Sequence, residues 1–111
     1  MPQVNADQLD MQPRHLVMLK QLLAMYVPDA EVWAYGSRVN GTGHECSDLD
    51  VVLRCPDDLQ REVTQWLDLK EALQNSLLPM SIDLHLWSHL PKAFHEEIER
   101  RYVVLSLPSP K

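Results

Sequence analysis

The chain has 111 residues, of which 45% are hydrophobic and 23% charged, and its formal net charge is −6. A chain of this length builds one hydrophobic core, so we expect a single globular domain. No apolar run approaches the about 20 residues of a membrane-spanning helix, and the acidic excess argues against a groove for non-specific nucleic-acid binding. The N-terminal residues carry acids and no apolar core of a signal peptide, so we expect a cytoplasmic location.

The first predicted element is an amphipathic helix that begins at Pro13. Apolar residues recur at spacings of three and four as far as Val27, and Pro28 ends the pattern. A short strand is predicted over residues 31–35. It leads directly into a polar loop, residues 36–47, which contains all three glycines of the chain. Backbone freedom is therefore needed in this loop above all.

The second half of the chain continues the alternation of strands and helices. Residues 48–54 are the clearest predicted strand, because apolar and polar side chains alternate there. An amphipathic helix is predicted from residue 59 to about residue 74, and a third alternating strand over residues 81–87. A last helix is expected within residues 88–101, and residues 103–107 predict an edge strand before the terminal prolines.

This order of elements predicts an α/β (α+β) domain of two layers, a small mixed sheet with helices packed on one face. We expect a polar leader at residues 1–12, the folded domain at residues 13–107 and a short tail at residues 108–111. The uncovered face of the sheet would carry the polar residues of each strand.

Three carboxylates are predicted on that uncovered face. Asp48 and Asp50 are separated by one residue, so both side chains point to the same side of their strand, and Asp83 joins them from a neighbouring strand. Carboxylates this close repel one another unless a cation lies between them, and oxygen ligands suit Mg²⁺ or Mn²⁺. Such a set can hold two divalent ions for in-line displacement at phosphorus. The alternative is a solvated strand face, although acids are depleted in strands.

The glycine-bearing loop complements the carboxylates. Gly36 and Ser37 follow a predicted strand, where free backbone N–H groups and the Ser37 hydroxyl can bind phosphate oxygens. Gly36 has no Cβ and allows close approach to the backbone, and Arg38 can pair with a phosphate. The alternatives are a turn or cap role for Ser37 and a solvated Arg38.

Other residues near this face have a simpler interpretation. His85 shares the face of Asp83 by alternation and is interpreted as a surface histidine, with a contact to substrate or metal as the alternative. Trp33, Tyr35 and Trp87 are interpreted as packing residues, with stacking against a nucleotide base as the alternative.

These motifs resemble those of a known superfamily. Gly36-Ser37, ten intervening residues and then Asp48-Leu49-Asp50 are similar to the signature of polymerase-beta-like nucleotidyltransferases. Gly-Ser-Arg with Gly41, and Ser47 before the first aspartate, resemble the minimal nucleotidyltransferase (MNT) branch. Asp83 resembles the third carboxylate of the superfamily. The resemblance covers most of the chain.

The resemblance implies a two-layer nucleotidyltransferase fold and a Mg²⁺-dependent enzyme that uses an NTP, with ATP as the expected donor. MNT proteins pair with helical HEPN-domain toxins in prokaryotic toxin–antitoxin modules. There they act as antitoxins that transfer AMP to a toxin tyrosine, and we expect the same here. One alternative is an antitoxin that neutralises its toxin by binding alone. Another is nucleotidyl transfer to a small molecule, which normally needs an additional substrate domain.

Overall fold

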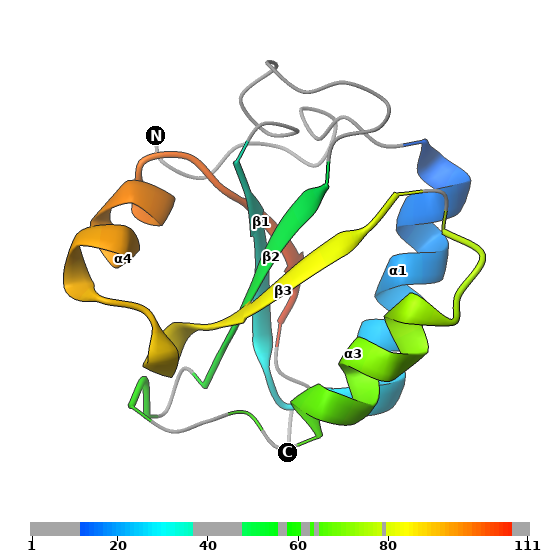
Figure 1. Ribbon diagram of the computed structural model, residues 1–111, viewed down its shortest axis with the longest axis horizontal. Helices are drawn as coiled ribbons and strands as arrows, with labels where there is room; N and C mark the ends of the chain where they lie inside the picture. The colour runs from blue at the N-terminus through cyan, green and yellow to red at the C-terminus, as the bar shows by residue number, and fades with distance from the viewer. Residues whose placement is uncertain are drawn as a thin grey trace.

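The computed structural model describes residues 12–36, 48–55, 58–60, 63, 65–78 and 80–107 (Figure 1). Within these residues the elements follow in the order α1 Pro13–Tyr26, β1 Glu31–Tyr35, β2 Leu49–Arg54, α3 Trp66–Gln74, β3 Ile82–Leu86, the 3₁₀ turn η2 Trp87–His89, α4 Lys92–Glu99 and β4 Val103–Ser106. Of the predicted loop 36–47, only Gly36 is described. The predicted tail and all of the predicted leader except Gln12 also lie outside the described residues.

The four strands form one mixed sheet in the order β3-β2-β1-β4. β1 pairs antiparallel with both β2 and β4, whereas β2 and β3 run parallel. A parallel pair needs a crossover connection, and α3 lies in the chain between β2 and β3. The mixed sheet predicted from the alternation of strands and helices is therefore confirmed.

Helix α1 begins and ends where its prolines predict. Pro13 occupies the first helical position, where its fixed φ suits the helix and its missing N–H costs nothing. The Gln12 carbonyl accepts hydrogen bonds from the backbone N–H groups of His15 (3.0 Å) and Leu16 (3.1 Å). At the other end the Val27 N–H donates to the Leu23 carbonyl, before Pro28 leaves the helix.

One face of the sheet packs against α1 and α3, which Figure 1 shows on the same side. Their buried leucines meet the aliphatic residues of the strands in the main core. The side chains of Leu19, Leu23, Val32, Leu49 and Leu69 are completely removed from solvent. These two helices and the sheet form the two layers that the sequence predicts.

The opposite face carries a second, smaller apolar cluster, which confirms the packing role predicted for Trp33, Tyr35 and Trp87, although no helix was expected on this face. It consists of the buried residues Trp33, Tyr35, Val52, Trp87 and Ile98. Ile98 belongs to α4, which Figure 1 shows on the far side of the sheet from α1 and α3. The polar residues therefore occupy only part of this face of the sheet, and packed aromatic residues occupy the rest.

Several element boundaries differ from those predicted, and apart from the start of α3 each differs by one residue. Helix α3 begins at Trp66 and not near residue 59, because Gln65 has a φ of 66° and a left-handed residue does not continue a helix. Val63, part of the apolar spacing, is buried in the main core without being part of α3. The third strand ends at Leu86, since Trp87 begins the turn η2. In the part of the chain that the structure describes, no helix is long and apolar enough to cross a membrane.

Candidate active site

The candidate site lies on the α4 side of the sheet, where three strands place side chains in one row. Tyr35 of β1 is the register partner of Asp50 on β2, and Asp50 is the partner of Asp83 on β3. Partners in adjacent strands lie about 5 Å apart and point to the same face. The pairing of the strands therefore brings two carboxylates and a phenol together from segments far apart in the sequence.

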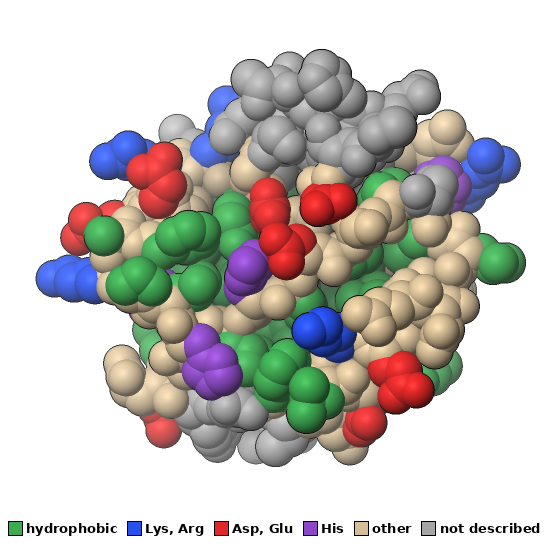
Figure 2. All heavy atoms as spheres, viewed as in Figure 1, with side chains coloured by type: hydrophobic (Ala, Val, Ile, Leu, Met, Phe, Trp, Pro, Cys, Tyr) green, Lys and Arg blue, Asp and Glu red, His purple; other side chains and the backbone are tan. Residues whose placement is uncertain are grey.

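His85 joins the two carboxylates. It follows Asp83 by two residues on β3, and its Nε2 lies 3.2 Å from Asp83 Oδ2. Asp50, Asp83 and His85 each offer one ligand atom, and these three atoms lie within 4.8 Å of one another. Figure 2 shows acidic side chains gathered beside a histidine and a hydrophobic area on this face of the molecule. We call these three residues the acidic–histidine cluster.

The residues of the cluster differ in solvent exposure between the inner strand β2 and the edge strand β3. Asp50 on the inner strand β2 is half-buried. Asp83 and His85 on the edge strand β3 have side chains that are 53% and 30% exposed, respectively. A ligand can therefore approach from solvent at the β3 edge and reach the half-buried Asp50 carboxylate behind it.

The electrostatics of Asp50 indicate a site suited to a cation. Burial raises the pKa of the Asp50 carboxyl above its ordinary value, and the neighbouring Asp83 carboxylate raises it further. His85 acts in the opposite direction, while Asp48 adds a smaller rise to the pKa. Two carboxylates that oppose each other's ionisation are stabilised by a divalent cation between them, which oxygen ligands suit.

Gly36 lies directly against the Asp50 carboxylate. It has a φ of +86°, which only glycine adopts readily, and a Cβ built there would overlap Asp50 Oδ2. The described structure thus gives Gly36 a definite role, to leave room for the Asp50 side chain at the end of β1. The predicted approach of a phosphate to Gly36 stays a prediction.

Tyr35 completes the row as a neutral phenol. Burial raises the pKa of its hydroxyl, and the Asp50 and Asp83 carboxylates raise it further, so the group stays protonated. The residue is 8% exposed, yet its hydroxyl has no hydrogen-bond partner within the described part of the chain. Its ring contacts those of Phe94 (6.1 Å between centroids) and His85 (6.2 Å).

The predicted site residues fall into three groups. The structure brings Asp50 and Asp83 together and places Gly36 against Asp50. Asp48 is exposed, lies just before β2, and is not among the ligand atoms of the cluster. Ser37 and Arg38 lie outside the described residues, so their contacts to phosphate stay predictions.

Two residues near the carboxylates were given a lesser role by sequence analysis. The sequence pattern indicates a surface position for His85 and a packing role for Tyr35. The structure confirms the packing of Tyr35, and it shows that both residues also adjoin the carboxylates. For His85 the available signal was its alternation with Asp83, which places both side chains on one face. For Tyr35 it was the position directly before Gly36, but only the register with Asp50 reveals the contact.

Three comparisons with known proteins show what this chain is similar to. The family described as "Nucleotidyltransferase domain" matches residues 17–105. A Haemophilus influenzae protein named "Probable protein adenylyltransferase MntA" is 39% identical over 98 residues, which are 88% of this chain and 84% of that protein. A solved structure described as a toxin–antitoxin with AMP-PNP is similar with a TM-score of 0.64 and 20% identity, over 88% of this chain and 76% of that one.

These comparisons differ in what they establish. At 20% identity, the solved structure supports the fold alone. The family match spans most of the chain, and the Haemophilus influenzae relative covers a similar share at a much higher identity. These matches confirm the family that the motifs Gly36-Ser37 and Asp48-Leu49-Asp50 resemble. The chain belongs to the nucleotidyltransferase domain family.

Proposed function

We propose that this protein is an antitoxin that transfers AMP from ATP to a tyrosine hydroxyl of a HEPN-domain toxin and so inactivates it. The observation that carries the proposal is the register pairing of Asp50 with Asp83, whose carboxylates meet beside the turn at Gly36. This arrangement supports metal-dependent chemistry on a nucleotide phosphate. The adenylyltransferase relative supports AMP as the transferred group, and the toxin–antitoxin neighbour with AMP-PNP supports a toxin partner.

The roles of the site residues follow from their positions. Asp50 and Asp83 would hold the metal, and Asp48, exposed just before β2, would supply a further carboxylate. We propose two Mg²⁺ ions, with Mn²⁺ as the alternative. When bound, the ions neutralise phosphate charge and favour ionisation of the attacking hydroxyl. The Gly36 turn, the Ser37 hydroxyl and Arg38 bind the β- and γ-phosphates.

The transfer is an in-line displacement. The acceptor hydroxyl oxygen forms a bond to the α-phosphorus, and the bond from this phosphorus to the oxygen that bridges to the β-phosphate breaks. Pyrophosphate leaves, and Asp83 accepts the proton of the hydroxyl. The Asp83 side chain is 53% exposed on the edge strand β3, so a hydroxyl on a large partner protein can reach it.

The activity is tested by incubating the protein with a candidate HEPN toxin, a divalent cation and each NTP in turn. Mass spectrometry of the toxin should reveal added AMP only when ATP and the cation are both present, and peptide mapping should place it on a tyrosine. Removal of the cation with EDTA should abolish the reaction. A toxin that stays unmodified, although both proteins are folded and the cation is present, contradicts the proposal.

Neutralisation by binding alone is the second candidate. It is separated from catalysis by co-expressing the toxin with the Asp50→Asn variant, which keeps the surface of the protein and changes one charge of the site. Under our proposal this variant fails to protect cells from the toxin. Full protection by the variant would favour binding alone. The cytoplasmic location and the absence of non-specific nucleic-acid binding stay predictions from the sequence.

A further inference from the structure

We propose that His85 is a nitrogen ligand of the metal site, which makes the site prefer a transition-metal ion such as Mn²⁺ or Co²⁺ to Mg²⁺. The inference rests on the proposed function in one respect, the presence of a divalent cation between the Asp50 and Asp83 carboxylates. It goes further because it names a nitrogen donor and revises the preferred ion. The carboxylates alone accept Mg²⁺, whereas a site that includes His85 binds Mn²⁺ or Co²⁺ more tightly.

The geometry of the acidic–histidine cluster supports this role. The ligand atoms of Asp50, Asp83 and His85 lie within 4.8 Å of one another. His85 Nε2 is 3.2 Å from Asp83 Oδ2. Neighbouring ligands of an octahedral ion are about 3.0 Å apart, since each bond is about 2.1 Å long. The separation of nitrogen and oxygen in this structure therefore already matches that of two adjacent ligands of one ion.

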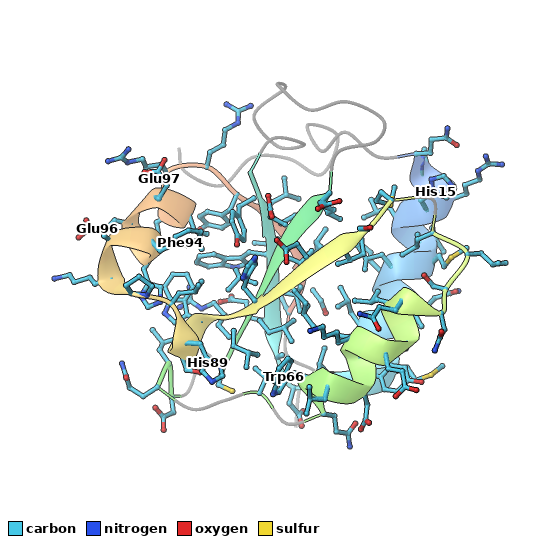
Figure 3. The ribbon with its side chains drawn as sticks, viewed as in Figure 1. His15, Trp66, His89, Phe94, Glu96 and Glu97 are labelled. Atoms are coloured by element: carbon cyan, nitrogen blue, oxygen red, sulfur yellow. The ribbon has the colours of Figure 1, made fainter. Side chains whose placement is uncertain are left out.

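The surroundings of His85 hold its ring in place. The imidazole contacts the ring of Phe94 (6.4 Å between centroids) and that of Tyr35 (6.2 Å). Figure 3 shows Phe94 on the side of α4 that faces the sheet, whereas Glu96 lies on the outer side of this helix. A metal-binding histidine with a restrained ring loses less conformational freedom when it binds an ion.

Tyr35 gives a second indication of a ligand at this place. Its side chain is more than nine-tenths buried, and its hydroxyl has no partner among the described residues. The pKa of this hydroxyl is raised by burial and by both cluster carboxylates, so the phenol lies within their electrostatic reach. An unsatisfied buried donor beside a cation site is explained by an oxygen atom of a bound ligand.

The chemistry of the donor set determines the selectivity. Mg²⁺ takes oxygen ligands and retains several waters, so a nitrogen donor adds little to its binding. First-row transition ions accept imidazole, and their affinity for a mixed oxygen and nitrogen site increases from Mn²⁺ to Co²⁺. A site made only of Asp48, Asp50 and Asp83 has oxygen donors alone, so it lacks the preference for transition-metal ions that an imidazole ligand adds.

The direct test is pulsed EPR of Mn²⁺ bound to the full-length protein. A coordinated imidazole modulates the electron spin echo through its ¹⁴N nucleus, and this modulation should be present in the wild type. It should change to the ¹⁵N pattern in protein labelled with ¹⁵N-histidine, and it should disappear in His85→Gln. The matched control is His15→Gln, on α1 across the sheet from the cluster, which should retain the modulation (Figure 3).

Titrations with Mg²⁺, Mn²⁺ and Co²⁺ provide the second measurement. In His85→Gln we expect at least about a tenfold loss of affinity for Mn²⁺, a larger loss for Co²⁺ and no more than about a twofold change for Mg²⁺. If His85 only orients Asp83 by a hydrogen bond, the affinity falls equally for all three ions, and the inference is wrong.

The outcomes separate the inference from the proposed function. Bound Mn²⁺ without nitrogen modulation in the wild type overturns the role of His85 and leaves the carboxylate site intact. A failure to bind any divalent cation, with or without AMP-PNP, overturns both. Because the labelled wild type is itself a test, the result does not depend on whether His85→Gln folds.

Discussion

The two faces of the sheet are built from the same strands, yet they serve different purposes. On the face covered by α1 and α3, the alternate residues Val32, Leu49, Val51 and Val103 are aliphatic and almost completely buried. On the opposite face the residues between them include the aromatic Trp33 and Tyr35, the ionisable Asp50 and one buried aliphatic residue of β2, Val52. The period of two along each strand thus separates the source of stability from the source of chemistry.

The second face has a core of its own beside the site. Arg54, at the end of β2, lies over the rings of Trp33 (4.2 Å to the centroid) and Trp87 (4.5 Å), and its Nε is 3.0 Å from Glu31 Oε1. Trp33 also stacks on Tyr102. These contacts form a rigid aromatic base next to the carboxylates. Charged side chains are tolerated on this face because the packing beside them holds the strands in register.

The largest effect is expected from a substitution on the face of the sheet that carries Asp50, Asp83 and His85, which we call the chemical face. Asp50→Asn removes a metal-binding charge but keeps the shape of the side chain. AMP transfer should fall about 10³-fold, because a bound cation supplies several kcal/mol of transition-state stabilisation. Mass spectrometry of the toxin after timed reactions measures this rate.

The control for Asp50→Asn is Asp29→Asn, the same substitution at an exposed position in the turn before β1. It should leave the rate of transfer unchanged. Circular dichroism should give the same folded spectrum for both variants. If Asp50→Asn retained more than about a tenth of the rate, the carboxylate would not be an essential metal ligand.

The next largest effect is a loss of stability from a substitution on the face covered by α1 and α3, which we call the helical face. Leu23→Ala should lower the free energy of unfolding by about 3 kcal/mol, because Leu23 is completely buried and the truncation leaves a cavity. Urea denaturation measures this loss, and the rate of AMP transfer by the remaining folded protein should stay close to that of the wild type. The control is Leu77→Ala, at a side chain that is 87% exposed, which should change stability by less than about 0.5 kcal/mol.

A substitution at the junction of the two faces should affect both properties. Gly36→Ala forces alanine into a left-handed backbone conformation, which costs about 1–2 kcal/mol of stability. The new Cβ also overlaps Asp50 Oδ2, so the carboxylate must move. Displacement of a catalytic group by about 1 Å can reduce a rate about 100-fold. Urea denaturation and the transfer assay measure the two effects.

A double-mutant cycle separates the two causes. In an Asp50→Ala background the new Cβ has no carboxylate to displace, so Gly36→Ala should cost less stability there than in the wild type. Equal costs in both backgrounds would mean that the backbone conformation alone accounts for the loss.

The fold was predictable to the extent that burial follows a regular period. The strands and α1 were located correctly because alternation and helical spacing are local signals, and the prolines at 13 and 28 bound the helix. The start of α3 was not predicted correctly, because Val63 fits the apolar pattern although it is not part of the helix. It is buried in the core, while the left-handed Gln65 excludes a continuous helix. Apolar spacing reports burial and not the backbone conformation.

The site was predictable for residues whose type carries the chemistry. Asp50 and Asp83 are rare residue types within strands, and their alternation predicted a shared face. The contributions of Tyr35 and His85 depend on strand register and on the side-chain directions at the sheet edge. Register depends on how the chain returns between β1 and β2 and on the crossover to β3, and these long-range connections leave no local pattern in the sequence.

The smallest expected effect concerns how pH changes the stability of the chemical face. The folded pKa of Asp50 is raised by burial and by Asp83, so the folded state favours the protonated carboxyl. The resulting stabilisation is fully present below the unfolded pKa and is lost as pH rises through the folded pKa. Relative to Asp50→Asn, the wild type should therefore become less stable as the pH rises above about 4, the ordinary pKa of an aspartyl carboxyl.

Thermal unfolding of both proteins as a function of pH, with and without a divalent cation, measures the effect. Without the cation the melting temperature of Asp50→Asn should exceed that of the wild type increasingly as pH rises, by less than the change that Gly36→Ala produces. A saturating cation should remove or reverse this difference, since it stabilises only the wild-type carboxylates. A difference that is independent of both pH and the cation would mean that Asp50 carries no electrostatic cost, and that the two faces of the sheet are less distinct than their side chains indicate.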